Sequence, residues 1–269
     1  KEKLRFITRI KERDSQWIHD LDQIKSSAAA FFSTLFTSKR EGRAKPQLFF
    51  DLLQDDVANE EFHKFSLLEE VRAVVFSISC DSAPGPDGFG VGFYQGAWVA
   101  ISSDLLEVVH DFFRSVQQPK GFTSTLIILI PKGPGACCWR EFRPISLCSV
   151  IYKTISKILA NRLKLVLNKC ISNTQSAFVP DRQILDDVIL AHEYMHYLKN
   201  KRQGKEGYIA IKLDMAKAYD RVEWHFLQAM MQKMGFCAQW ITWITSCLKT
   251  VTYSFNCNGD NKGFIAPTR

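Results

Sequence analysis

The stretch Tyr208-Ile-Ala-Ile-Lys-Leu-Asp214-Met-Ala-Lys-Ala-Tyr-Asp220 decides the fold class that the sequence predicts. Its first part, residues 208–213, is largely apolar and rich in residues favoured in strands, and a helical pattern begins soon after Asp214. A strand that ends on a carboxylate holds that group rigidly, as binding of a hard cation such as Mg²⁺ requires. We therefore expect an α/β protein with a buried strand over 208–213 and Asp214 at its tip.

Periodicity and turn residues predict the other elements of the chain. A capping box at Ser66–Glu69 predicts a helix start, and the turn Asn258–Asn261 predicts a hairpin. Helical patterns cover 21–37, 66–78, 93–98, 104–116, 150–170, 184–200, 222–234 and 239–249, and strand patterns cover 126–130, 251–257 and 263–266.

Composition and charge limit the functional classes. No apolar run approaches the ~20 residues of a transmembrane helix, so we expect no membrane partner. The eight cysteines form no Cys-x-x-Cys pair, which favours reduced thiols in an intracellular protein. The sequence has no initiator Met, so we expect it to begin inside a longer product.

Between Lys132 and Lys169 there are eight basic residues and one acidic residue, a balance equal to the net charge of +7 of the whole chain. Such a concentrated basic region suits a polyanionic partner.

The run from Asp214 to Asp220 resembles the first catalytic motif of reverse transcriptases, an aspartate followed by four residues and then an aromatic-Asp pair. It is most similar to the non-LTR (LINE-type) branch found in plant retroelements. Further blocks resemble the same family in the same order: Ala83–Phe89, Leu129–Lys132, Phe142–Leu147, Tyr152–Leu163 and Gln175–Leu190. The resemblance implies an α/β polymerase-like fold with an N-terminal extension or linker over 1–65. Mostly helical fingers with a β-ribbon would cover 66–203, and an incomplete palm sheet would cover 204–269.

The resemblance also implies the roles of five residues in an RNA-directed DNA polymerase that adds dNTPs to a primer 3′-hydroxyl. Asp214 would be catalytic and, with the backbone carbonyl of Met215, would bind the two catalytic Mg²⁺ ions, for which Mn²⁺ is an alternative. Lys132 and Arg143 would bind the triphosphate of the dNTP, since phosphoryl transfer needs cations on the phosphate oxygens. Tyr219 matches the position whose ring excludes the ribose 2′-hydroxyl.

The partners implied are an RNA template and a DNA primer or target, in the nucleus and the cytoplasm. On the helix expected over 150–170, Lys153, Lys157 and Lys164 share one face, which we name the lysine stripe and expect to contact a phosphate backbone. Gln175 and Arg182 match a block that positions the template. Arg162 lies among apolar residues instead, which favours a buried carboxylate as its partner.

The sequence leaves three alternatives open: a polymerase fragment that is inactive alone, a nucleic-acid-binding remnant and a zinc peptidase. The family's Tyr-x-Asp-Asp motif is absent from the sequence, so we expect residues 1–269 to be inactive alone. The chain could instead be a non-catalytic, nucleic-acid-binding remnant of a degenerate element. His192-Glu193-Tyr-Met-His196 also matches the His-Glu-x-x-His pattern of zinc peptidases. No recognisable third ligand follows, because Lys199 stands where the extended motif has glycine.

Overall fold

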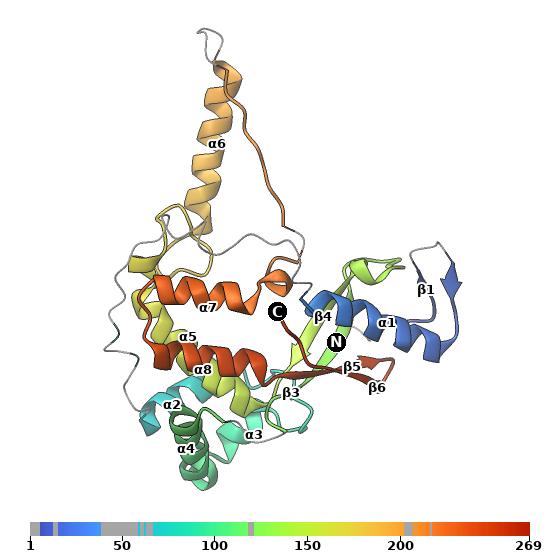
Figure 1. The fold of residues 1–269 in the computed structure, drawn as a ribbon, viewed down its shortest axis with the longest axis vertical. Coiled ribbons are helices and arrows are strands. Elements are labelled where there is room, and N and C mark those ends of the chain that lie inside the picture. The colour runs from blue at the N-terminus through green and yellow to red at the C-terminus, as the bar shows by residue number, and fades with distance from the viewer. Residues whose placement is uncertain are drawn as a thin grey trace.

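The structure of the 269-residue chain is a computed structural model, and it describes residues 6–12, 16–38, 59, 62, 67–117, 121–201, 207–215 and 217–269. It is an α/β arrangement in which a group of helices lies beside a four-stranded mixed sheet, as Figure 1 shows. The α/β fold class that the sequence predicts is therefore confirmed.

Most of the predicted helices form close to their expected bounds. The helices are α1 (Leu21–Phe36), α2 (Leu68–Phe76), α3 (Val91–Gly96), α4 (Trp98–Ser115), α5 (Val150–Cys170), α6 (Ile184–Asn200), α7 (Trp224–Lys233) and α8 (Ala238–Lys249). The described residues also form the short 3-10 helices η3 (Trp139–Glu141) and η4 (Tyr219–Arg221). The prediction of a capping box at the start of α2 is wrong, because the N-cap is Leu67, which makes no side-chain cap hydrogen bond. Ser66 itself lies outside the described residues.

The sheet has the strand order β4-β3-β5-β6 and joins two segments far apart in sequence. Strand β3 (Ser124–Pro131) pairs antiparallel with β4 (Phe142–Leu147) and parallel with β5 (Thr252–Cys257). Strand β6 (Asp260–Ile265) returns from β5 through a turn of only two residues, Asn258 and Gly259, both with positive φ, so Asp260 and Asn261 already belong to the strand. The β3–β4 ribbon and the C-terminal hairpin therefore share a single hydrogen-bonded sheet.

Helix α1 covers one face of this sheet and encloses an apolar core of its own. Phe32 stacks on Phe255 of β5 with ring centroids 5.3 Å apart, and Ile24, Ala28 and Phe36 are also buried. Within the N-terminal region, for which the resemblance implies an extension or linker, residues Leu21–Phe36 pack against the sheet.

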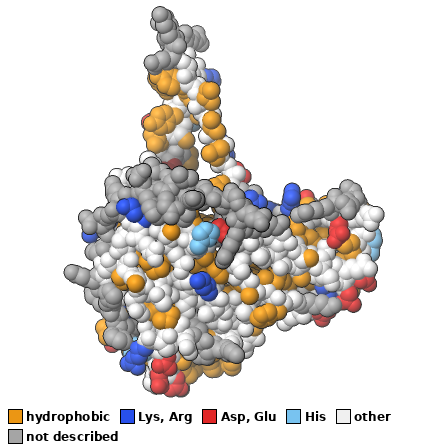
Figure 2. Space-filling view, in the orientation of Figure 1, with side chains coloured by type: hydrophobic (Ala, Val, Ile, Leu, Met, Phe, Trp, Pro, Cys, Tyr) orange, Lys and Arg blue, Asp and Glu red, His pale blue; other side chains and the backbone are white. Residues whose placement is uncertain are grey.

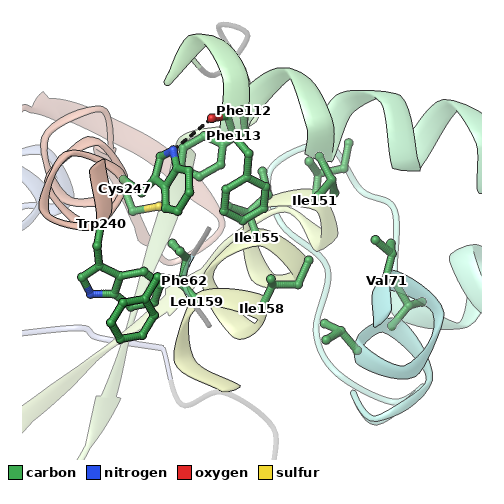
Figure 3. Packing of buried hydrophobic residues seen from close by; sticks show 14 of the residues in the cluster. Phe62, Val71, Phe112, Phe113, Ile151, Ile155, Ile158, Leu159, Trp240 and Cys247 are labelled. Carbon is green, nitrogen blue, oxygen red and sulfur yellow. Dashed lines mark hydrogen bonds between the residues drawn. The ribbon is translucent and has the colours of Figure 1, made fainter. Parts of the chain in front are cut away.

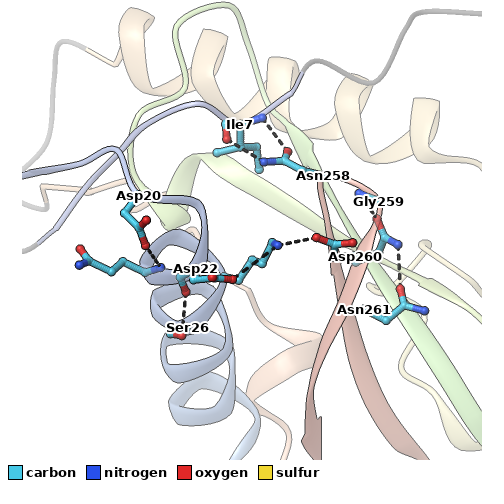
Figure 4. A network of polar contacts seen from close by, with 11 residues as sticks. Ile7, Asp20, Asp22, Ser26, Asn258, Gly259, Asp260 and Asn261 are labelled. Carbon is cyan, nitrogen blue, oxygen red and sulfur yellow. Dashed lines mark hydrogen bonds and ion pairs between the residues drawn. The ribbon is translucent and has the colours of Figure 1, made fainter.

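Polar contacts fix both ends of α1 to the C-terminal hairpin and its continuation. On the N-terminal side, the Ile7 amide, which precedes α1, donates to Asn258 Oδ1, and Asn258 Nδ2 donates to the Ile7 carbonyl (Figure 4). Within α1, Lys25 Nζ donates to Asp260 Oδ2 at 2.5 Å. At its C-terminal end, α1 has no basic residue in its last turn. There the Thr268 amide donates to the Phe36 carbonyl and Arg269 Nε donates to the Leu35 carbonyl, so distant residues satisfy the free carbonyls of the helix end.

A second and larger core lies among the helices. Helix α5 supplies Ile151, Ile155, Ile158 and Leu159, which pack against residues of α2, α4 and α8 (Figure 3). Trp240 of α8 is fully buried and stacks on Phe62 with centroids 4.1 Å apart. This core holds the basic helix α5 rigidly and leaves its opposite face for polar side chains.

The predicted strand over 208–213 is not formed. Residues 207–215 are extended but have no ladder partner among the described residues, and Ile209, Ile211 and Leu213 are 88%, 76% and 85% exposed. The segment runs beside α6, which projects from the body and has no buried residue (Figure 1). Apolar side chains of α6 and of residues 207–215 are therefore exposed to solvent, as Figure 2 shows. A strand needs a neighbour for its backbone groups, and the described sheet offers none at this place.

Candidate nucleotide and nucleic-acid site

Lys132 and Arg143 lie on one face of the β3–β4 ribbon. Arg143 is directly opposite Ile130 in the antiparallel register, and Lys132 follows Ile130 by two residues. Because side chains along a strand point alternately to the two faces, all three side chains lie on the same face of the ribbon. The odd-numbered residues Ile127 and Leu129 are buried in the core under α1, whereas Lys132 and Arg143 are exposed. The structure thus brings the two predicted phosphate-binding cations together on the ribbon face opposite α1.

The tip of the ribbon is fixed by the carboxylate of Glu141. Its Oε2 accepts hydrogen bonds from the backbone amides of Cys137 at 2.6 Å and Cys138 at 3.2 Å, and these two bonds lower the pKa of Glu141. The Lys132 amide donates to the Glu141 carbonyl at 2.8 Å and closes the base of the same loop. The loop that ends in Lys132 and Glu141 is therefore a hydrogen-bonded unit.

Residues of the N-terminal segment bind the tip of the ribbon through hydrogen bonds to Cys137 and Trp139. The sequence patterns did not predict this arrangement. The indole Nε1 of Trp139 donates to Ser27 Oγ at 3.0 Å, and Ser27 Oγ donates to Glu12 Oε1 at 3.0 Å. The Lys11 amide also donates to the Cys137 carbonyl at 2.7 Å. The one available signal was the composition of the tip, where a large aromatic residue follows two cysteines in an otherwise small-residue loop.

Asp214 and Met215 lie in the exposed segment 207–215. Both side chains are exposed, and no strand fixes them. Within the described part of the chain, no group of three His, Cys, Asp or Glu side chains is placed to hold a metal ion. A two-ion site needs several converging carboxylate oxygens, so the described residues alone do not fit one.

Tyr219 connects the Asp214 motif with the block that carries Gln175. The Tyr219 ring is 75% exposed and meets Phe178 edge to face, with centroids 6.0 Å apart. Gln175 is two residues before Ala177, whose carbonyl accepts a hydrogen bond from Gln175 Nε2 at 3.2 Å. The structure therefore places the predicted steric-gate residue beside the predicted template block.

Lys217 is the most unusual residue of the motif. It has a positive φ of 53°, and its Nζ is enclosed without a hydrogen-bond partner among the described residues. The ammonium lies 4.9 Å and 5.3 Å from the ring centroids of Phe32 and Phe31 on α1. Burial lowers the pKa of Lys217, and the Asp220 carboxylate opposes that shift. Burial in turn raises the pKa of Asp220.

Two residues of the lysine stripe also bond the loop that precedes α3. Lys153 Nζ donates to the Ala83 carbonyl at 2.8 Å, and Lys157 Nζ donates to the Ser77 carbonyl at 3.1 Å, whereas Lys164 is exposed. Gly85 lets this loop approach closely, because a Cβ there would lie 2.5 Å from the Ser149 amide nitrogen. Each lysine that bonds a carbonyl keeps two further N–H donors.

Arg162 is bound by a carboxylate, as its position among apolar residues predicts. Its Nε and Nη2 donate to the two oxygens of Glu70 at 3.1 Å and 2.8 Å, and its guanidinium lies 5.1 Å from the Phe113 ring centroid. The paired geometry and the burial of Arg162 assign it to the core, where it ties α5 to α2.

Arg182 closes the loop that follows α5. Its guanidinium donates to the carbonyls of Ile171, Ser172 and Gln175 at 3.1, 2.5 and 2.6 Å. These hydrogen bonds satisfy backbone acceptors at a helix end, so Arg182 shapes the segment that carries Gln175.

The His-Glu-x-x-His segment lies on α6, away from the ribbon. His192, Glu193 and His196 line a hollow of about 490 Å³ together with Tyr197, Asn200 and Lys201. Asn200 Nδ2 is 2.9 Å from a ring nitrogen of His196. No third side chain of a metal-binding type completes a ligand group here among the described residues.

Comparison with protein families matches residues 130–268 to the family described as reverse transcriptase (RNA-dependent DNA polymerase). The chain therefore belongs to the reverse transcriptase family. It is 28% identical over 253 residues to the transposon TX1 uncharacterized 149 kDa protein of Xenopus laevis, a match that covers 93% of the chain and 19% of that protein. It is 25% identical over 224 residues to the retrovirus-related Pol polyprotein from the type-2 retrotransposable element R2DM of Drosophila melanogaster, which covers 81% of the chain and 20% of that protein.

A third relative is the "Probable RNA-directed DNA polymerase from transposon BS" of Drosophila melanogaster, 27% identical over 164 residues, or 59% of the chain and 17% of that protein. The chain spans about one fifth of the length of these curated relatives. Members of the family generally use divalent metal ions and act on nucleic acid. In the parts of the chain that are described, no helix is long and apolar enough to cross a bilayer.

Proposed function

We propose that the chain supplies the nucleotide-binding and template-binding part of an RNA-directed DNA polymerase from a non-LTR retroelement. The observation that carries this proposal is the common face of Lys132 and Arg143 on a ribbon whose tip is hydrogen-bonded in place. Both residues fall within the stretch that matches the reverse transcriptase family.

The ribbon face suits the triphosphate of a dNTP. Arg143 offers a planar fork of N–H donors for two phosphate oxygens, and Lys132 offers a compact charge on a flexible stem. Both side chains are exposed, so a ligand can reach them from solvent. In phosphoryl transfer such cations stabilise negative charge that builds on the phosphate oxygens.

Tyr219 is proposed as the residue that excludes the ribose 2′-hydroxyl, and its exposed ring beside Phe178 supports this role. Asp214 and the Met215 carbonyl are proposed as this chain's contribution to the Mg²⁺ or Mn²⁺ sites of the complete polymerase. Asp214 belongs to no group of three metal-binding side chains among the described residues, so other residues of the complete polymerase would supply the remaining ligands.

The lysine stripe is proposed as the contact to the phosphate backbone of an RNA template or DNA primer. Lys164 is exposed, and Lys153 and Lys157 each keep donors beyond the one used on a carbonyl. Gln175 and Arg182 are proposed to present the loop on which the template lies. The family resemblance assigns such a polymerase to the nucleus and the cytoplasm.

A second candidate is a nucleic-acid-binding remnant without catalysis. It is favoured by the observation that Asp214 belongs to no group of three metal-binding side chains within the described residues. The two candidates share the nucleic-acid contacts and differ in nucleotide binding by the ribbon.

The test is fluorescence titration of the chain with a labelled RNA–DNA primer–template and with a labelled dNTP, over a range of salt concentrations. The triple variant Lys153→Gln, Lys157→Gln, Lys164→Gln should reduce the slope of log K against log salt by about 0.7–0.9 for each phosphate that the protein no longer neutralises. Lys132→Ala with Arg143→Ala should weaken dNTP binding and leave most of the RNA affinity. Lys249→Gln, an exposed lysine at the end of α8, is the matched control.

An unchanged slope in the triple variant would remove the lysine stripe from the interface. RNA binding without any dNTP binding, in the wild-type chain, would favour the remnant over the polymerase.

A further inference from the structure

Helix α6 projects from the body of the molecule and is exposed along its whole length (Figure 1). None of its residues is buried, although most of them are apolar. A helix of this composition is normally enclosed by other protein, because exposed apolar surface is unfavourable in water. Helix α6 therefore has the character of an interaction surface.

One line of apolar side chains on α6 has the spacing of a coiled-coil seam, and we name it the α6 stripe. Its members follow one another at alternating intervals of four and three residues: Ile184, Val188, Ala191, Met195 and Leu198. At about 100° per residue they fall within roughly 80° of the helix circumference. Ile184, Val188 and Met195 are 66%, 57% and 57% exposed, so the stripe is accessible to another helix.

The α6 stripe faces away from the extended segment that runs beside α6. Tyr208 of that segment meets Tyr197 with ring centroids 6.2 Å apart, and His192 and His196 line the hollow on α6. Around the helix, Tyr197 and the two histidines lie between about 80° and 220° from Ile184, whereas the stripe stays within about 40° of it. A second helix can therefore lie along the stripe without displacing the segment.

The charges on α6 match those of the same helix in the reverse direction. Asp186 and Asp187 lie in its first turn, and Lys199 lies in its last turn. In an antiparallel pair each acidic end lies beside the basic end of the other copy, and the two helix dipoles also attract each other. A parallel pair would bring like charges together at both ends. Charge complementarity thus favours a second copy of this chain, related by a two-fold axis that closes the assembly as a dimer.

We propose that the chain forms a homodimer in which the α6 stripes of two copies pack antiparallel around Ala191. The small Ala191 side chain lets the two helices approach closely at the middle of the contact. Reversing the stripe about this residue places Ile184 opposite Leu198 of the second copy, and Val188 opposite Met195. A helix of this length spans about 25 Å, which gives a contact smaller than a standard interface. The dimer is therefore weak and depends on protein concentration.

The test is analytical ultracentrifugation of the nuclease-treated chain over a range of micromolar concentrations, so that no nucleic acid bridges two copies. The wild-type chain should show a reversible monomer–dimer equilibrium. Met195→Lys places an unpaired charge in the seam of both copies and should weaken the dimer about tenfold or more. Ile189→Lys is the matched control, because Ile189 is 51% exposed on the same helix but lies about 100° from the nearest member of the stripe. Val188→Lys repeats the test if Met195→Lys does not fold.

Two outcomes of the ultracentrifugation would overturn the proposal. Equal weakening by Met195→Lys and Ile189→Lys would mean that association does not use the α6 stripe. A chain that stays monomeric at every concentration would exclude the dimer. In that case, a fall in Tm for Met195→Lys and not for Ile189→Lys would show that the stripe packs within one copy.

A photoreactive side chain tests the direction of the pairing. With p-benzoylphenylalanine in place of Leu198, irradiation of the dimer should cross-link the second copy close to Ile184, as mass spectrometry of the digested product can show. Cross-links to the second copy close to its own position 198 would indicate parallel helices and contradict the antiparallel pairing. Cross-links to the helices of the body would show that a different surface covers α6 and would also overturn the proposal.

Discussion

Trp139 at the tip of the β3–β4 ribbon donates its indole N–H to Ser27 of α1 at 3.0 Å, although 112 residues separate them in sequence. The ribbon carries Lys132 and Arg143, and α1 also lies beside Lys217 through Phe31 and Phe32. Helix α1 therefore contacts both the ribbon for which we propose phosphate binding and the Asp214 motif, and it connects the two parts of the candidate site.

We predict that Ser27→Ala destabilises the chain by about 1–2 kcal/mol, because the buried indole N–H loses its acceptor. Ser26→Ala is the matched control, since the Ser26 hydroxyl is exposed and bonds the Asp22 carbonyl of its own helix. Urea denaturation measures both variants. Equal stability of the two variants would mean that the Trp139–Ser27 bond does not hold the ribbon tip.

The ribbon tip should loosen in acid. Hydrogen bonds from the Cys137 and Cys138 amides lower the pKa of Glu141, so the stabilisation is complete above the unfolded value of about 4.3 and is lost as the pH falls through the lower folded value. Amide hydrogen exchange of Cys137, corrected for its intrinsic rate, should therefore speed up in that range. In Glu141→Gln the corrected rate should not vary with pH, and wild-type protection that persists to low pH would contradict the account.

Arg162 should matter for stability and not for nucleic-acid binding. Arg162→Met leaves Glu70 as a partly buried, unpaired carboxylate and should cost roughly 2–4 kcal/mol, somewhat less than a fully buried pair because the Glu70 side chain is 32% exposed. The double variant Arg162→Met, Glu70→Leu should recover most of that stability. A loss of RNA affinity in the double variant at full stability would place Arg162 in the interface instead.

We predict that the chain does not retain zinc. His192 and His196 have no third ligand among the described residues, and two exposed histidines one helical turn apart bind zinc weakly. Elemental analysis after dialysis against a mild chelator should find far less than one zinc per chain. One retained zinc that disappears in His196→Ala would reverse this interpretation.

Sequence periodicity predicts the packed parts of this fold well and the isolated segment 208–213 badly. Helix α5 forms over the expected residues because its apolar stripe has a core to fill, and Arg162 finds its carboxylate for the same reason. Residues 208–213 have strand composition, but a strand also needs a hydrogen-bonded neighbour, which composition does not reveal. The contact between α1 and the ribbon tip could not be predicted either, because it pairs residues from distant segments through side chains with no periodic signal.

The most direct test of the central claim is primer extension on an RNA template with Mg²⁺ by a chimera. In it, the 81% of the chain that matches the Pol polyprotein of the element R2DM replaces the corresponding stretch of that protein, and binding to primer–template serves as the folding control. We predict that the chimera incorporates dNTPs and that Asp214→Asn abolishes incorporation without changing primer–template binding. Residues 1–269 alone should incorporate none, because Asp214 belongs to no group of three metal-binding side chains in their described part. Equal synthesis by the chimera and its Asp214→Asn variant, or a chimera that binds primer–template as its parent does and makes no DNA, would contradict the account.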